Sequence, residues 1–276
     1  MKIYAFADES SSLLDGQIDA LKRNGLDGLE IRNVEGTNVS EISESKAKEI
    51  KNRLSGEGLK VWSVGSPIGK IKITDDFDKH LEVFKHTLSV AEALGAENIR
   101  LFSFYVSKDD NYDDYKNEVI DRLGTFLEIS SGSGIDICHE NEKGIFGDNF
   151  ERCKIILDAL PQLKGIFDPA NFVQCGVETL SAWNGLKNRI KYLHIKDCLK
   201  SGNVVPAGCG DGNLKQILDD FKSLGGNALT IEPHLSVFKG LEALENEGER
   251  SNIGEYKYES NEAAFDAACN ALKNLL

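Results

Sequence analysis

Short apolar segments alternate with amphipathic segments along the whole chain. The apolar segments have the length and residue types of buried β-strands, and they cover residues 2–8, 28–33, 60–66, 98–106, 135–141, 163–171, 190–197 and 228–234. Between them, apolar positions recur at helical spacing. The clearest case has steps of 4, 3, 4 and 3 through Phe77, Leu81, Phe84, Leu88 and Ala91. It predicts a helix capped by Thr74, and a second apolar stripe predicts a last helix over 261–275.

Glycines mark the points where the predicted helices end and the next strands begin. They are Gly25, Gly58, Gly95, Gly134 and the pair Gly225–Gly226. A glycine in the left-handed conformation is a common way to end a helix, so the pattern indicates repeated βα units. Eight such units without a change of composition or a linker predict one (β/α)8 TIM barrel domain over residues 1–276. An open, doubly wound sheet is the alternative, but no strand is followed by G-x-G-x-x-G.

Composition narrows the classes of partner. The formal net charge is −13 and no run of basic residues stands out, so a nucleic acid is disfavoured as a partner. The six cysteines form no C-x-x-C pair, and the chain begins without the apolar segment of a signal peptide. No apolar run approaches the roughly 18–20 residues that span a membrane. We therefore expect a cytoplasmic protein that acts neither on nucleic acid nor at a membrane.

Metal-binding residue types occur at the ends of the last four predicted strands. These residues are Glu140, Asp168, His194 and Glu232. The active site of a TIM barrel lies at the carboxyl ends of its strands, and side chains alternate between the two faces of a strand. We assign the four residues to the inward face. Cys138, Ile166, Tyr192 and Thr230, two positions earlier, should then fill the barrel, while Ile137, Phe167, Leu193 and Ile231 should pack under the helices.

Three carboxylates and an imidazole in one pocket favour a bound cation, because the like charges would otherwise force proton uptake. Oxygen-rich ligation with one nitrogen suits Mn²⁺ or Mg²⁺ best, and Co²⁺ or Zn²⁺ also fits. The alternative is that polar residues end many strands without forming a site. Four consecutive strands ending this way favour one divalent metal ion.

Four short motifs in this order resemble the xylose-isomerase-like barrel superfamily. They are "HENEKG", "FDPAN", "YLHIKD" and "TIEPH", and "GLDGLEIR" and "VPAGCGDGNL" extend the likeness over the whole chain. This superfamily includes sugar phosphate isomerases and epimerases, ketose 3-epimerases, hydroxypyruvate isomerase and inosose dehydratase, with endonuclease IV as a distant relative. The resemblance implies that Glu140, Asp168, His194 and Glu232 hold the metal.

The resemblance also implies a reaction. The metal would bind adjacent oxygens of a small sugar or sugar phosphate and acidify the C–H beside the carbonyl. Glu140 and Glu232 would remove the proton and return it to the enediolate. The trinuclear zinc cluster of the nuclease branch needs further histidines, but none occurs on the first four predicted strands, and Asn171 stands where many relatives have one of them.

Several further residues are candidates for substrate contact. They are Lys196, Asn171, Arg32, Lys200 and His234. Lys196 and His234 share the inward parity of His194 and Glu232, and Arg32 ends the second strand. Lys200 stands where ketose epimerases tend to carry an arginine, and a solvated loop lysine is the alternative for it.

Other polar residues near these strand ends have simpler interpretations. Glu30 should point inward behind the ligands, whereas His139 and Asp197 should point away from the pocket. Arg100 could pair with a carboxylate. The loop "AGCGDGNL" (207–214) either binds phosphate at a helix N-terminus or forms a tight turn with Asp211 or Asn213 as the helix cap, which we favour because Asp211 would repel phosphate. The stretch 235–260 could form a lid or a contact in a homo-oligomer.

Three functions remain open at this point. The first is a divalent-metal-dependent isomerase or epimerase of a small sugar or sugar phosphate. The second is a metal-dependent lyase of the inosose or keto-sugar dehydratase type, which begins with the same proton abstraction. The third is a barrel that binds metal or carbohydrate without turnover.

Overall fold

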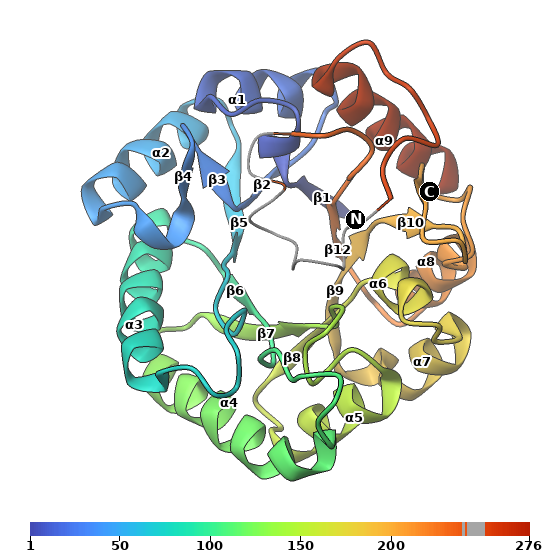
Figure 1. The fold of residues 1–276 in the computed structure, drawn as a ribbon. Helices are drawn as coiled ribbons and strands as arrows, with labels where there is room; N and C mark the ends of the chain where they lie inside the picture. Colours follow the sequence, from blue (N-terminus) through green and yellow to red (C-terminus); the bar gives the residue numbers. More distant parts are fainter. Residues whose placement is uncertain (239–240, 242–251) are drawn as a thin grey trace.

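The predicted closed barrel is confirmed. The computed structural model describes residues 1–238, 241 and 252–276, and its parallel strands close in the order β1-β12-β9-β8-β7-β6-β5-β2, with β2 paired to β1 (Figure 1). The barrel strands are β1 (Lys2–Ala5), β2 (Gly28–Ile31), β5 (Lys60–Gly65), β6 (Asn98–Leu101), β7 (Asp136–Glu140), β8 (Lys164–Phe167), β9 (Ile190–Ile195) and β12 (Ala228–Ile231). Two short hairpins, β3 (Asn33–Val34) with β4 (Thr37–Asn38) and β10 (Asp197–Cys198) with β11 (Val204–Val205), lie outside the barrel sheet.

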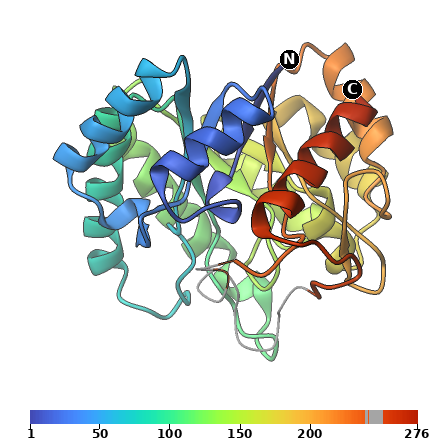
Figure 2. The same ribbon diagram turned by 90° about the horizontal axis from the view of Figure 1, so that it is seen from above.

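Helices surround the barrel on its outer side (Figure 1). They are α1 (Leu14–Arg23), α2 (Glu44–Gly56), α3 (Phe77–Leu94), α4 (Lys116–Ser130), α5 (Phe150–Ala159), α6 (Pro169–Gln174), α7 (Thr179–Leu186), α8 (Leu214–Ser223) and α9 (Asn261–Leu275). Short 3₁₀ turns cover Ala7–Glu9, Val39–Glu41, Tyr112–Tyr115 and Lys187–Arg189. Figure 2 shows α9 beside α1, and the ion pair between Arg23 and Asp266 (2.9 Å) joins these two helices.

Two apolar layers hold the barrel together. The outward residues of the strands, including Ile137, Phe167, Leu193 and Ile231, belong to the main core under the helices. A smaller cluster fills the inside of the barrel with Tyr4, Trp62, Cys138, Ile166, Tyr192 and Ala228. The rings of Tyr4 and Trp62 stack within it at 4.9 Å. The predicted alternation of inward and outward residues is therefore confirmed for these strands, and Thr230 is fully buried as well.

Several predicted boundaries are wrong for local reasons. The segment 163–171 ends as a strand at Phe167 because Pro169 begins α6, and proline favours the first turn of a helix. Only the first part of 98–106 is a strand. Helix α3 is capped by Asp76, whose side chain accepts the N–H of Lys79, and not by Thr74. The glycine endings are confirmed; Gly95, for example, follows α3 at φ +70°.

Three further expectations concern the cysteines, a membrane span and the stretch 235–260. All six cysteines are free thiols, as expected. None of the helices that the structure describes is both long enough and apolar enough to cross a membrane. Residues 239–240 and 242–251, which make up much of the stretch expected to be a lid or oligomer contact, lie outside the described residues.

Candidate active site

The four residues at the ends of the late strands converge. Glu140 is the last residue of β7, Asp168 follows β8, His194 lies in β9 and Glu232 follows β12. One ligand atom from each lies within 4.8 Å of the others, and all four side chains are buried. Because parallel strands in a barrel end at the same height, alternation within each strand is enough to bring the four together.

Asp168 is fixed by the start of α6. It is the N-cap of this helix, and its Oδ1 accepts the N–H of Asn171 at 2.9 Å. Its backbone exchanges two hydrogen bonds with the side chain of Asn141, both 2.9 Å long. These contacts leave Oδ2 turned toward Lys196 and the rest of the cluster.

His194 lies between two carboxylates. Its Nδ1 is 2.8 Å from Glu140 Oε1, and its Nε2 is 3.1 Å from Glu30 Oε2. Glu30 in turn accepts a hydrogen bond from the hydroxyl of Tyr192 at 2.9 Å. Burial lowers the pKa of His194, but Glu140 and Glu30 outweigh this effect and raise the pKa to about 10. Glu30 thus points inward behind the cluster, as predicted, and its contact with Nε2 orients the imidazole.

Lys196 connects two of the carboxylates. Its Nζ is 2.9 Å from Asp168 Oδ2 and 3.0 Å from Glu232 Oε2. Burial raises the pKa of Asp168 to about 7 in spite of Lys196. The pKa of Glu232 is held well below its usual range, because Lys196 and neighbouring cationic groups outweigh burial. Lys196 therefore points into the cluster, as its parity with His194 predicted.

Arg32 pairs with three carboxylates at once. Its Nε and Nη2 bind Asp8 at 3.0 and 3.1 Å, Nη2 also binds Glu9 at 3.1 Å, and Nη1 binds Glu232 at 3.2 Å. The guanidinium lies over the ring of Phe6 at 4.4 Å, and only 1% of Arg32 is exposed. Arg32, predicted as a substrate contact, therefore has its nitrogens committed to carboxylates.

A second arginine holds the other glutamate of the cluster. Arg100 Nη1 is 3.1 Å from Glu140 Oε2, and its guanidinium lies 5.0 Å from the same Phe6 ring. Glu140 and Glu232 are thus each paired with one buried arginine, and Phe6 lies against both guanidinium groups. This arrangement fixes the positions of two carboxylates that would otherwise repel each other.

The donor set fits a divalent cation. Three carboxylates and one imidazole offer ligand atoms around a common point, and Glu140 Oε2 and Asp168 Oδ2 receive no well-directed hydrogen bond among the described residues. Carboxylate oxygens with a single nitrogen suit Mn²⁺, Mg²⁺, Co²⁺ or Zn²⁺. The residues present are therefore able to hold one such ion.

Uncharged polar atoms lie next to this donor set. Asn171 Oδ1 and His234 Nδ1 have no hydrogen-bond partner in the described part of the chain. Asn171 Nδ2 approaches Glu140 Oε1 at 3.5 Å. His234 Nε2 is 3.4 Å from Glu9 Oε1 and 3.7 Å from Glu232 Oε1. The backbone of His234 is held at φ +44°, a strained value for a non-glycine residue. Asn171 and His234 thus lie beside the cluster, and their contact with a substrate stays a prediction.

Two other residues lie outside the cluster. Lys200 is exposed, and its backbone N–H binds Asp211 Oδ2 at 2.7 Å, so the structure does not bring it to the four residues. His139 is buried on the outer side of β7 and lies 2.9 Å from the hydroxyl of Ser103. Burial lowers the pKa of His139 to about 3, which keeps the ring neutral. His139 therefore packs in the core, as predicted.

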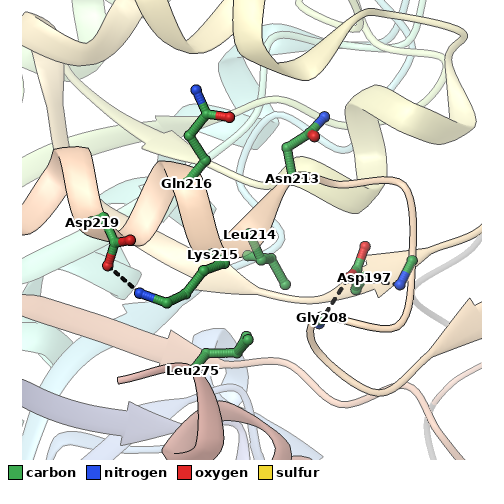
Figure 3. Close-up of a pocket in the computed structure, with 9 residues that line it drawn as sticks. Asp197, Gly208, Asn213, Leu214, Lys215, Gln216, Asp219 and Leu275 are labelled. Atoms are coloured by element: carbon green, nitrogen blue, oxygen red, sulfur yellow. Dashed lines mark hydrogen bonds and ion pairs between the residues drawn. The ribbon is translucent and has the colours of Figure 1, made fainter.

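Asp197 organises the glycine-rich loop before α8. Its carboxylate accepts the backbone N–H groups of Gly208, Gly210 and Gly212 at 2.9, 3.0 and 3.0 Å, and the Gly208 contact is visible in Figure 3. The loop borders a pocket of about 400 Å³. The tight turn is confirmed. Asn213, one of the two predicted caps, is the N-cap residue of α8, but its side chain makes no capping hydrogen bond. Asn213 has φ +56° and its side chain binds Thr179, while Asp211 binds the N–H of Lys200.

Asp197→Asn should lower the free energy of unfolding by about 2 kcal/mol, because an amide replaces an ionised acceptor of several N–H groups and turns an NH₂ toward donors. Chemical denaturation measures this change. Asp219→Asn is the control: it breaks only the exposed pair with Lys215, so its expected cost is below about 0.5 kcal/mol. Equal costs for the two variants would contradict the role of Asp197.

Sequence reasoning missed the acidic pair Asp8 and Glu9. Both follow β1 in a 3₁₀ turn, and both are buried against Arg32. Burial raises the pKa of Glu9 to about 8 although Arg32 opposes this. Glu9, Glu232 and His234 form a second group with ligand atoms close together. The sequence did indicate these two residues, because "FADE" places two acids at the end of the first predicted strand.

Comparison with known proteins places this barrel in a family. The sequence profile described as "Xylose isomerase-like TIM barrel" matches residues 18–251. The chain belongs to this family. No curated protein sequence matches it significantly.

Solved structures share the fold of this xylose isomerase-like barrel. The IOLI protein with a bound zinc atom has a TM-score of 0.77 at 17% identity, over 100% of this chain and 98% of that one. D-psicose 3-epimerase with D-tagatose, from Clostridium cellulolyticum H10, has a TM-score of 0.77 at 15% identity, over 100% and 98%. The probable 3-DHS dehydratase AsbF from Bacillus anthracis has a TM-score of 0.75 at 16% identity, over 99% of both chains. At these identities the likeness concerns the fold.

Proposed function

We propose that this protein is a divalent-metal-dependent isomerase or epimerase that acts on a small sugar or sugar phosphate. The observation that carries the proposal is the convergence of Glu140, Asp168, His194 and Glu232 on one point at the end of the barrel. Family membership and neighbours that include an epimerase and a zinc-bound barrel support it.

In this proposal the same four residues hold the metal ion. Mn²⁺ is our first choice, because three oxygen donors and one nitrogen suit a hard to borderline cation, and Mg²⁺, Co²⁺ and Zn²⁺ are the alternatives. When bound, the ion supplies Lewis-acid polarisation of the substrate carbonyl.

Glu140 and Glu232 serve as the acid and base. One carboxylate removes the proton from the carbon beside the carbonyl, and the other returns a proton to the opposite face for epimerisation. Return of the proton to the neighbouring carbon gives isomerisation instead. The separate arginine partners of these glutamates support distinct, fixed positions for the two groups.

The roles of the predicted substrate-binding residues follow from the groups that surround each of them. Lys196, between Asp168 and Glu232, is placed to stabilise negative charge on the enediolate. Asn171 and His234 have unpaired polar atoms for substrate hydroxyl groups. Arg32 is better assigned to positioning Glu232, and Lys200 remains a loop residue that could approach the substrate.

Incubation with a panel of ketoses, aldoses and their phosphates in deuterated water tests this function. We expect deuterium on the carbon next to the carbonyl only in the metal-loaded protein, together with a higher melting temperature when Mn²⁺ is added to chelator-treated protein. Loss of water from the substrate would indicate the lyase instead. Metal binding without exchange or elimination on any panel member would favour a non-catalytic binder.

A further inference from the structure

We infer that the substrate is an uncharged polyhydroxy carbonyl compound and not a phosphate ester or a carboxylic acid. The inference rests on the proposed function and selects a substrate class for the same site. Three independent features of the described residues support it: an occupied anion-binding loop, buried basic side chains that are each paired, and unpaired uncharged groups beside the metal ligands.

The first feature is the loop where many barrels bind phosphate. Such sites use backbone N–H groups at the loop and helix that follow the seventh or eighth strand. In this protein, the N–H groups of Gly208, Gly210 and Gly212 point to the carboxylate of Asp197. An ideal Cβ at Gly210 would lie 2.3 Å from Asp197 Oδ1, so the carboxylate fills the concave side of the loop (Figure 3). An internal anion takes the place of a substrate phosphate.

The second feature is the pairing of the basic side chains. Arg32 binds three carboxylates, and Arg100 binds Glu140. Lys196 lies between Asp168 and Glu232.

Lys70 is a further basic side chain that is paired, in this case with Glu142. The two side chains form an ion pair of 3.1 Å, with 10% and 16% of them exposed. Lys70 lies 4.5 Å from the ring of Phe102, and the guanidinium of Arg100 lies 4.8 Å from the same ring. Because Arg100 pairs with Glu140, the pair of Lys70 and Glu142 belongs to the surroundings of the site. A phosphate or carboxylate arriving here would compete with carboxylates already bound to these cations, and like charges at close range in a buried site oppose binding.

The third feature is the set of groups left for a ligand. Asn171 Oδ1 and His234 Nδ1 are buried without a hydrogen-bond partner among the described residues. An amide and an imidazole match the hydroxyl groups of a sugar, which both donate and accept. A site built for hydroxyl groups leaves buried polar atoms unpaired until such a ligand binds.

Matched ligands test this inference on the Mn²⁺-loaded protein. Each ketohexose of the panel is paired with its 1-phosphate and its 6-phosphate, and deuterium exchange gives kcat/KM for each member. We expect the uncharged sugar to exceed both phosphates by at least about tenfold. In a separate calorimetric titration, inorganic phosphate and sulfate should show no binding at concentrations up to several millimolar.

The variant Glu142→Gln sharpens the test, because it removes the partner of Lys70 and one negative charge beside the site. We expect the preference for the uncharged sugar over its phosphate to fall at least about threefold. The control is Glu82→Gln, which removes a charge from an exposed pair with Lys85 on α3 and should leave the preference unchanged.

The outcomes separate the inference from the proposed function. Exchange into a phosphorylated sugar that equals or exceeds the uncharged one, or binding of inorganic phosphate with a Kd below about 1 mM, overturns the inference and leaves the proposed function standing. Absence of exchange with every sugar, charged or not, overturns the proposed function and the inference with it. An unchanged preference in Glu142→Gln would remove the Lys70–Glu142 pair as a source of discrimination and count against the inference.

Discussion

Glu140→Gln and Glu232→Gln should each lower the rate of deuterium exchange by about a thousandfold or more. Glutamine keeps the size and shape of glutamate but can neither accept the substrate proton at neutral pH nor supply an anionic metal ligand. Glu140 also accepts from His194 and pairs with Arg100, so its loss disturbs the cluster at two points. Kinetics in deuterated water, with bound metal measured on the same samples, gives the result.

The control for these variants is Asp136→Asn at the opposite end of β7. Asp136 forms a partly exposed pair with Lys191, far from the carboxyl end where Glu140 lies, so its exchange rate should stay within about twofold of the original protein. The melting temperature of each variant separates loss of chemistry from loss of fold. Retained exchange in either folded glutamine variant would remove that glutamate from the role of acid, base and ligand.

Arg32→Met should lower the free energy of unfolding by about 3–5 kcal/mol. The substitution keeps an apolar stem but leaves Asp8, Glu9 and Glu232 without their shared cation in a buried site. For a chain of this size the melting temperature should fall by roughly 10 °C. Thermal and chemical denaturation measure both quantities, and chelator-treated protein removes the contribution of bound metal.

The pH dependence of this loss has a definite sign. Without Arg32 the buried carboxylates take up protons more readily, because their neutral forms avoid the cost of an unpaired buried charge. The deficit of Arg32→Met should therefore be largest near pH 8 and become smaller as the pH falls toward 5.5. A deficit that grows on acidification would contradict the charge-based explanation.

Arg53→Met is the matched control for Arg32→Met. Arg53 pairs with Asp15 on the surface, where 54% and 77% of the two side chains are exposed. A solvated pair of this kind contributes little, so the expected change is within about 1 kcal/mol at any pH in the range. Similar losses in the two arginine variants would contradict charge pairing as the source of the effect at Arg32.

The sequence by itself determined the barrel and the place of its site. Eight apolar segments alternate with helical ones, and successive side chains of each strand point to opposite faces of the sheet. In a parallel barrel these two facts are sufficient to bring the carboxyl-end residues Glu140, Asp168, His194 and Glu232 to one height and one face. The directions of His139 and Asp197 followed from the same parity. His139 is one residue before the inward-facing Glu140, and Asp197 is three residues after the inward-facing His194.

Only the tertiary structure decided which charges pair. Arg32 and Glu232 are 200 residues apart in sequence, and the acidic pair at Asp8 and Glu9 comes from yet another strand. The position of a residue along a strand determines which way its side chain points, but not how far it lies from side chains on other strands. Parity alone therefore could not show whether Arg32 is free for a substrate or bound to three carboxylates. The glycine-rich loop shows the same limit. Its composition suits a phosphate site equally well, and the carboxylate of Asp197 occupies its N–H groups only because the fold of β10 and the loop brings them together.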